Sequence, residues 1–226
     1  MAFAEKLGLW VDYTDAIALY AVHNAGNTAP RVAPDAEQDG ARGDVAADFA
    51  RIRASLEQGI ARTAAPKRGQ SGVALPVPAD DAAADLGSVY ESYRRYYQAH
   101  QRDMDLSVPP LRARVREELA AASPALQQLA ALDGAFESIL NDREARLLAT
   151  VPQLLKKRFA HLRKLHLQTL EETQQSDRPD QWMHAGAWLA RFCDELQTVL
   201  LAELDLRLQP AVGLLEALQN EKTKSL

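Results

Sequence analysis

Few residues in this sequence have the types and spacing that catalysis or metal binding requires. Asp12 and Asp15 lie three positions apart, so on a helix they could share a face, split their pKa values for acid–base work or hold a cation. No third ligand or catalytic base accompanies them, and a helix cap or a solvated position is the favoured interpretation. The histidines include no pair four residues apart that would place two imidazoles on one metal ion: His23, His100, His161, His166 and His184.

The sequence also lacks a recognisable nucleophile or phosphate-binding motif. Gly69, Ser71 and Gly72 do not form a nucleophile elbow, which needs a glycine two residues away on each side of the serine. Neither a phosphate-binding glycine loop nor a dinucleotide fingerprint is present. Cys193 follows Phe192 on an apolar helix, which favours a small buried side chain over a reactive thiol. We therefore predict a non-enzymatic protein with no catalytic residue, metal site or cofactor.

The clearest charged feature is a basic cluster of five side chains in nine residues: Lys156, Lys157, Arg158, Arg163 and Lys164. Such a cluster could contact nucleic-acid phosphates, with an affinity that falls steeply as salt is added. Residues 167–205, however, carry eight acids against two bases. An antiparallel return of this acidic stretch onto the basic helix would neutralise the cluster within the chain, and that is the favoured interpretation.

Aromatic residues form a second feature. A stripe follows steps of four and three, the spacing of a heptad seam that packs against another helix: Leu86, Tyr90, Tyr93, Tyr97, His100 and Met104. Three arginines flank it, namely Arg94, Arg95 and Arg102. Aromatics interleaved with arginine can also stack on single-stranded nucleic acid, but the heptad spacing favours helix packing.

The composition is that of an ordinary globular chain. Its 226 residues carry 26 basic and 31 acidic side chains, a net charge of −5, and 47% of them are hydrophobic, which argues against wholesale disorder. A single cysteine excludes an internal disulfide and fits a reducing compartment. The sequence contains no charge-free run of about 18 apolar residues, so it predicts no membrane span. Acids at positions 5, 12 and 15 interrupt the apolar run that an export signal needs. We expect a cytoplasmic protein.

Glycine and proline divide the chain into helices and linkers. They gather at 26–43 and 64–80, which indicates flexible linkers. We therefore predict N-terminal helices within 1–63, a linker at 64–80 and a C-terminal bundle over 81–226. Apolar residues at steps of three and four predict a helix over 44–63 that Asp44 caps. Ser123 and Thr150, each followed by an early proline, predict further helix starts, and Pro109 and Pro110 are expected to end a helix over 82–107.

Apolar residues keep helical spacing from Leu111 almost to the C-terminus, and the short alternating run at 73–77 is interrupted by prolines. Long, narrow stripes with only 6% aromatic residues suit stacked helices with a thin core. We predict an all-α fold, an elongated helical bundle with coiled-coil-like seams. Because narrow seams leave apolar edges exposed, a partner chain or a second copy of the protein is expected to cover part of this surface.

Three stretches of the sequence together carry a family resemblance: Phe3–Trp10 running into Thr14–Leu19, then Pro110–Arg116, and finally Ala202–Pro210 with Gly213–Leu218. They resemble a proteobacterial family catalogued as a domain of unknown function, and Leu148–Pro152 and Arg191–Cys193 fit it too. The resemblance implies a cytoplasmic accessory protein of a system similar to the third type of Zorya anti-phage defence, in which two such proteins accompany a proton-driven membrane motor. The matching stretches are helix-packing patterns and not catalytic signatures.

The exposed seams predict a helical interaction component, and the resemblance implies that it binds the companion accessory protein and acts downstream of the motor. Large aromatics dominate contact energy where they are desolvated, so we expect the contacts at Tyr90, Tyr93, Tyr97 and Met104, with Trp10 and Tyr13 as a second patch. The alternative is a nucleic-acid-binding effector of the same system, in which the basic cluster holds DNA and Arg94 and Arg95 add a second contact.

Overall fold

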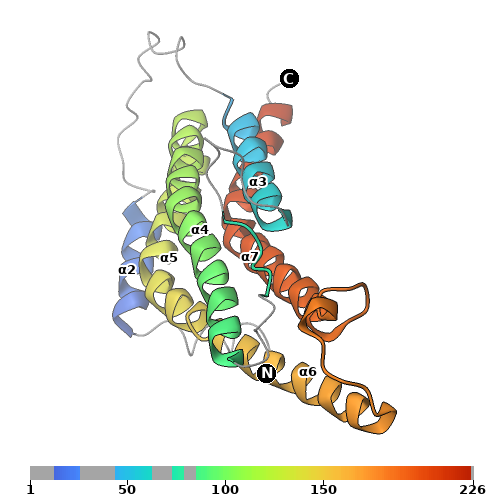
Figure 1. The fold of residues 1–226 in the computed structure, drawn as a ribbon. Helices are drawn as coiled ribbons and strands as arrows, with labels where there is room; N and C mark the ends of the chain where they lie inside the picture. The colour runs from blue at the N-terminus through green and yellow to red at the C-terminus, as the bar shows by residue number, and fades with distance from the viewer. Residues whose placement is uncertain (1–12, 26–43, 63–72, 79–84, 225–226) are drawn as a thin grey trace. The chain divides into compact units, whose positions relative to one another are not determined.

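The computed structural model describes residues 13–25, 44–62, 73–78 and 85–224 (Figure 1). Their helices are, in chain order, α2 (Tyr13–Ala25), α3 (Val45–Ala61), α4 (Leu86–Ala122), α5 (Pro124–Leu148), α6 (Val151–Thr173), the short 3₁₀ helix η2 (Pro179–Gln181) and α7 (Trp188–Lys224). No strand occurs among these residues, and the helices pack on one another, which confirms the predicted all-α helical bundle. Within the described ranges, no helix combines the length and the apolar character needed to cross a membrane.

The chain forms two compact units. The first comprises Met1–Ile52, Ser107–Leu147 and Arg207–Leu226, and the second comprises Arg53–Leu106 and Leu148–Leu206. Each unit therefore combines segments from both sides of 64–80. The expected linker at 26–43 lies outside the described residues, and only 73–78 of the other linker are described. There Leu75 is buried and the Tyr93 hydroxyl donates to the carbonyl of Pro76 at 3.0 Å, so this short piece packs on α4 in the second unit.

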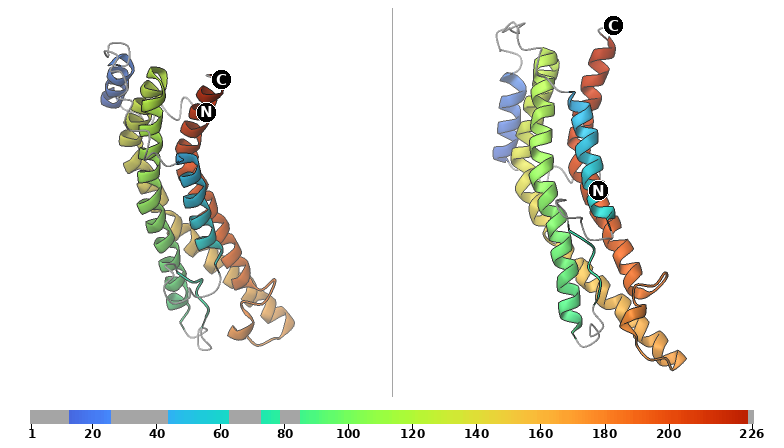
Figure 2. Two further views of the ribbon diagram at one scale, coloured as in Figure 1. Left: turned by 90° about the horizontal axis from the view of Figure 1, so that it is seen from above. Right: turned by 45° about the horizontal axis from the view of Figure 1, so that its top comes forward.

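In the first unit, α4 and α5 lie side by side (Figure 2), and the start of α3 and the end of α7 complete the core. Buried aliphatic side chains from all four helices meet there: Val45, Val115, Leu119, Leu126, Ala130, Leu214, Leu215 and Leu218. Full burial of each larger side chain contributes about 1.5–3 kcal/mol. The predicted helix over 44–63 is confirmed as α3, and Asp44 caps it by accepting from the amide of Ala46 at 3.0 Å.

In the second unit, aromatic rings fill the space between α4, α6 and α7. Tyr93 and Phe192 meet edge to face with centroids 5.5 Å apart, and Phe159 lies 5.1 Å from Phe192 and 5.2 Å from Trp188. Such arrangements contribute beyond simple area burial. The heptad stripe of α4 thus meets other helices, as its spacing predicts, and these helices belong to the same chain.

Two of the predicted helix boundaries, the starts after Ser123 and Thr150, are confirmed, and one boundary is wrong. Ser123 caps α5, because its hydroxyl accepts from the amide of Leu126 at 3.3 Å. Thr150 precedes α6 but makes no side-chain cap; its backbone carbonyl accepts from the amide of Gln153 at 3.0 Å instead. The expected end of a helix at Pro109 and Pro110 is wrong, because α4 continues through both prolines.

The position of these prolines on α4 explains why the helix continues. Each proline lacks the amide that would donate to the carbonyl four residues earlier, so α4 makes two fewer of its regular backbone hydrogen bonds at this point. Asp105 and Leu106, four residues before the prolines, are exposed, so water can reach their carbonyls. The opposite face stays buried at steps of four, three and four through Met104, Val108, Leu111 and Val115, and this packing outweighs the loss.

Candidate interaction surface

The aromatic residues expected to anchor a partner lie inside the second unit instead. Tyr90, Tyr93, Tyr97 and Met104 are between 0% and 5% exposed, so the prediction that they form an accessible partner-binding surface is wrong. The physical reason is that α6 and α7 of the same chain supply the helices that the heptad spacing requires. Of the second expected patch, Trp10 and the side chain of Tyr13 lie outside the described residues.

The hydroxyl groups of this stripe also bond within the chain. Tyr97 donates to Glu203 at 2.5 Å, and the Gln101 amide donates to both oxygens of the same carboxylate at 3.1 Å. Tyr96 donates to the carbonyl of Ile60 at 2.9 Å, and burial raises its pKa. Glu203 is only 4% exposed and lies in Ala202–Pro210, one of the stretches that carry the family resemblance. This stretch therefore serves packing between α4 and α7.

The arginines beside the stripe make short-range contacts on α4. Arg94 pairs with Glu91, three residues earlier, and Arg95 donates to the backbone carbonyl of Glu91 at 3.4 Å. Exposed contacts of this kind contribute little stability. Nothing in this geometry tests whether Arg94 and Arg95 contact DNA, and that role stays a prediction.

The acidic stretch neutralises two members of the basic cluster. Arg158 donates from two nitrogens to both carboxylate oxygens of Glu195 at 2.6 Å each, and these hydrogen bonds lower the pKa of Glu195. Arg163 pairs with Asp177. For both arginines this confirms the predicted return of acidic residues onto the basic helix.

The three lysines of the cluster remain exposed on α6. Within the described part of the chain, Lys156, Lys157 and Lys164 form no ion pair, and His161 is exposed between them. Leucines also reach the surface of this helix: Leu154 is 59% exposed, Leu165 44% and Leu167 40%. We call this set the α6 face: Leu154, Lys156, Lys157, His161, Lys164, Leu165 and Leu167.

The α6 face has a regular arrangement. With 3.6 residues per turn, Lys157, His161 and Lys164 follow the middle of the face, as their steps of four and three predict. Leu154 and Leu165 lie along one edge, and Lys156 and Leu167 lie along the other. The surface therefore combines a basic centre with leucines along both edges, and it can pair with carboxylates and cover apolar side chains at once.

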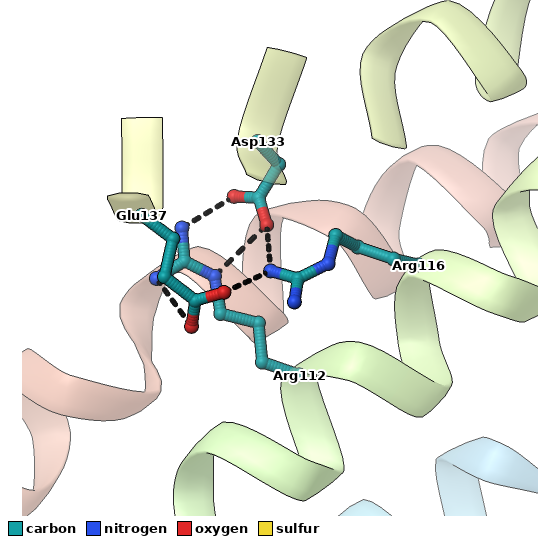
Figure 3. Close-up of polar contacts among 4 residues, drawn as sticks. All are labelled: Arg112, Arg116, Asp133 and Glu137. Atoms are coloured by element: carbon teal, nitrogen blue, oxygen red, sulfur yellow. Dashed lines mark hydrogen bonds and ion pairs between the residues drawn. The ribbon is translucent and has the colours of Figure 1, made fainter. Parts of the chain in front are cut away.

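A second set of charged residues connects α4 and α5 in the first unit, and Figure 3 shows it as a closed network. Arg112 donates to Asp133 at 2.9 and 2.6 Å, and Arg116 donates to Asp133 at 3.0 Å and to Glu137 at 2.6 Å. Arg114, from the same stretch Pro110–Arg116, pairs with Asp48 of α3 at 2.5 Å. All three arginines of Pro110–Arg116 thus form ion pairs between helices.

Sequence reasoning did not pair these residues. Arg112 and Arg116 are four apart, and so are Asp133 and Glu137, so each pair shares a helix face. Two basic residues four apart on one helix and two acidic residues four apart on the next helix are the sequence signal that could have predicted the network. Burial alone would raise the pKa of Asp133, but hydrogen bonds from the two arginines outweigh it and lower that pKa.

The other candidates for chemistry have ordinary surroundings. Cys193 is 2% exposed, and burial raises the pKa of its thiol to about 11, which confirms the predicted buried side chain. Asp12 lies outside the described residues, and Asp15 lies in the first turn of α2. Among the residues that the structure describes, no three His, Cys, Asp or Glu side chains gather as metal ligands would.

The fold and this surface define an all-α protein with an exposed basic helix face. Comparison with known families places the chain more closely: it belongs to the family described as "Protein of unknown function (DUF3348)", whose model matches residues 1–220. Neither a curated protein nor a solved structure shows significant similarity to the chain.

Proposed function

We propose that this chain is a non-enzymatic helical interaction protein whose α6 face binds an acidic surface of a companion protein. One observation carries the proposal: the chain uses its aromatic stripe and the two arginines of the basic cluster in its own packing, but leaves the lysines of α6 exposed beside leucines. Complementary charge steers association and sets specificity. An acidic amphipathic helix would match both the basic centre and the apolar borders.

The leucines favour a protein partner over nucleic acid. Phosphate binding needs cations alone, whereas Leu154, Leu165 and Leu167 gain only from an apolar surface that covers them. In addition, Arg158 and Arg163 are already paired with acids of the same chain. The alternative, a nucleic-acid-binding effector, therefore depends on the three lysines, with Arg94 and Arg95 as a second contact.

The biological setting of the proposal comes from the sequence resemblance. We propose that the companion is the second accessory protein of a Zorya-like anti-phage system, and that the complex acts in the cytoplasm downstream of a proton-driven membrane motor. The three stretches that carry the family resemblance support this setting. The binding role of the α6 face is argued from its own charges and exposure, and it can be tested without assuming the setting.

Co-purification from cells that express the chain with the products of its neighbouring genes tests the proposal. Reversing two charges of the α6 face, Lys157→Glu with Lys164→Glu, is expected to reduce the retained companion by at least about tenfold. The matched control, Arg102→Glu with Lys222→Glu, makes the same charge change at exposed positions elsewhere and should retain it. Equal retention by the two double variants would remove the α6 face from the interface.

A second pair of variants separates the two kinds of partner. Leu154→Ser with Leu165→Ser leaves every lysine in place, so it should weaken a protein complex but leave DNA binding unchanged. Gel shifts over a salt series supply the DNA measurement. DNA binding at low salt that is lost in the lysine variant and kept in the leucine variant would favour the nucleic-acid alternative over the protein partner.

A further inference from the structure

The second unit buries one arginine beneath the segment that joins α6 to α7, residues 174–187. Arg163 is 8% exposed, and its guanidinium carbon lies 4.7 Å from the ring centre of Trp182 and 5.4 Å from that of Trp188. Asp177 reaches it from the joining segment and pairs with one terminal nitrogen, Nη2. The chain thus covers a buried cation, which lies against two adjoining indole rings, with its own carboxylate.

Asp177 uses only part of the bonding capacity of this guanidinium. Its second oxygen accepts from the Trp182 indole at 2.8 Å and lies 3.2 Å from the His166 ring. Among the described residues, the Nε and Nη1 atoms of Arg163 and the indole nitrogen of Trp188 have no hydrogen-bond partner, and all three atoms are fully buried. Buried donors without acceptors are unfavourable, whereas a carboxylate bound side-on would engage two guanidinium nitrogens at once.

The covering segment is bounded at both ends by a residue with left-handed backbone. Gln174, at the end of α6, has φ 52°, and Gly186, just before α7, has φ 83°, so each end turns through a left-handed residue. Residues 174–176 and 184–186 are exposed. In the closed arrangement the free donors of Arg163 have no accessible surface, and a ligand can reach them only when the segment moves.

We propose that Arg163 and Trp188 form a binding site for a carboxylate ligand, and that segment 174–187 closes this site by placing Asp177 on the guanidinium. Two carboxylates on one buried guanidinium would leave an uncompensated negative charge, so Asp177 and the ligand compete. The apparent affinity for the ligand is then the intrinsic affinity multiplied by the fraction of molecules in which the segment is open. Arg163 does not belong to the α6 face, and this site is independent of the function proposed above.

The tryptophans provide the measurement. The chain has only three, Trp10, Trp182 and Trp188, so NMR resolves each indole N–H and follows it during titration with acetate. Asp177→Asn removes the internal carboxylate, and it should bind acetate at least about tenfold more tightly than the wild type, with the largest shift at Trp188. Asp180→Asn removes an exposed acid of the same segment, which pairs with Arg178 at 3.2 Å, and should titrate like the wild type.

Further variants make the outcome decisive. Adding Arg163→Gln to Asp177→Asn should abolish saturable acetate binding. If Asp177→Asn fails to fold, Trp182→Phe removes the indole donor that holds Asp177, and should itself raise acetate affinity. Equal affinities for Asp177→Asn and Asp180→Asn, no gain from Trp182→Phe, or binding that survives Arg163→Gln would each overturn the proposal. A glutamate tetrapeptide that binds much more tightly than acetate would identify an acidic polypeptide as the source of the carboxylate, and equal affinity per carboxylate would identify a small molecule.

Discussion

Replacement of Asp133 by alanine tests the charged network between α4 and α5. The Asp133 side chain is 11% exposed, and those of its partners Arg112 and Arg116 are 13% and 19% exposed. Breaking a fully buried ion pair by removing one partner costs about 3–5 kcal/mol, because it leaves an uncompensated charge. Here Glu137 still pairs with Arg116 at 2.6 Å and lies 3.6 Å from Arg112, so we expect the smaller loss of about 2–3 kcal/mol.

Urea unfolding followed by circular dichroism at neutral pH measures this loss. Asp142→Ala is the matched control, because Asp142 lies on the same helix and its side chain is exposed; a change at such a position costs less than about 0.5 kcal/mol. A cycle that combines Asp133→Ala with Arg112→Ala isolates the coupling between the two residues, which should exceed about 1 kcal/mol. Equal stability of Asp133→Ala and Asp142→Ala would show that the network contributes nothing and would refute the reasoning.

Three further predictions concern single groups. Hydrogen bonds from Arg163, Trp182 and His166 outweigh the effect of burial and lower the pKa of Asp177 from 3.8 to about 2. The stability that this lowered pKa gives is complete above about pH 5 and declines as pH falls from 4 toward 2, by about 2 kcal/mol. Other carboxylates with lowered pKa values, such as Asp133 and Glu195, titrate in acid as well, so acid titration of unfolding should show a decline in both proteins that is smaller by this amount in Asp177→Asn. Tyr97→Phe leaves the buried Glu203 without its phenol donor, and thermal or urea unfolding should show a loss of about 1.5–3 kcal/mol; an unchanged midpoint would contradict the stabilising role of this bond. Pro109→Ala restores an amide that can donate to an exposed carbonyl, and it should raise the unfolding midpoint, since proline costs about 3 kcal/mol inside a helix.

The helices could be predicted because their signals are local. Asp44 and Ser123 are capping residues whose bonds span two or three positions, and the heptad stripe of α4 correctly required helices beside it. The end predicted at Pro109 was wrong because the rule for proline counts only the lost backbone bond. The stripe continues at steps of four and three through Val108 and Leu111, and this continuation was the signal that the helix persists.

The candidate sites were harder to predict, because their residues meet only through tertiary packing. A heptad stripe such as that of Tyr93 and Tyr97 shows that a helix lies along it, but does not show whether that helix belongs to the same chain. Arg112 and Asp133 are 21 positions apart, and their pairing depends on how α4 and α5 align. The return of acids onto Arg158 was predictable, because a dense basic helix followed by an acidic stretch has one simple way to neutralise itself.

The type of each basic residue explains which part of α6 remains for a partner. Arginine presents a planar set of donors that matches a carboxylate on two atoms at once, whereas lysine is a compact and strongly hydrated charge. The acids of the chain accordingly pair with Arg158 and Arg163, and Lys157 and Lys164 stay in solvent near Leu154 and Leu165. An acidic helix that also covers the leucines gains both from charge complementarity and from apolar burial. Loss of binding in the lysine variant and in the leucine variant together is therefore the outcome that this division of residue types requires.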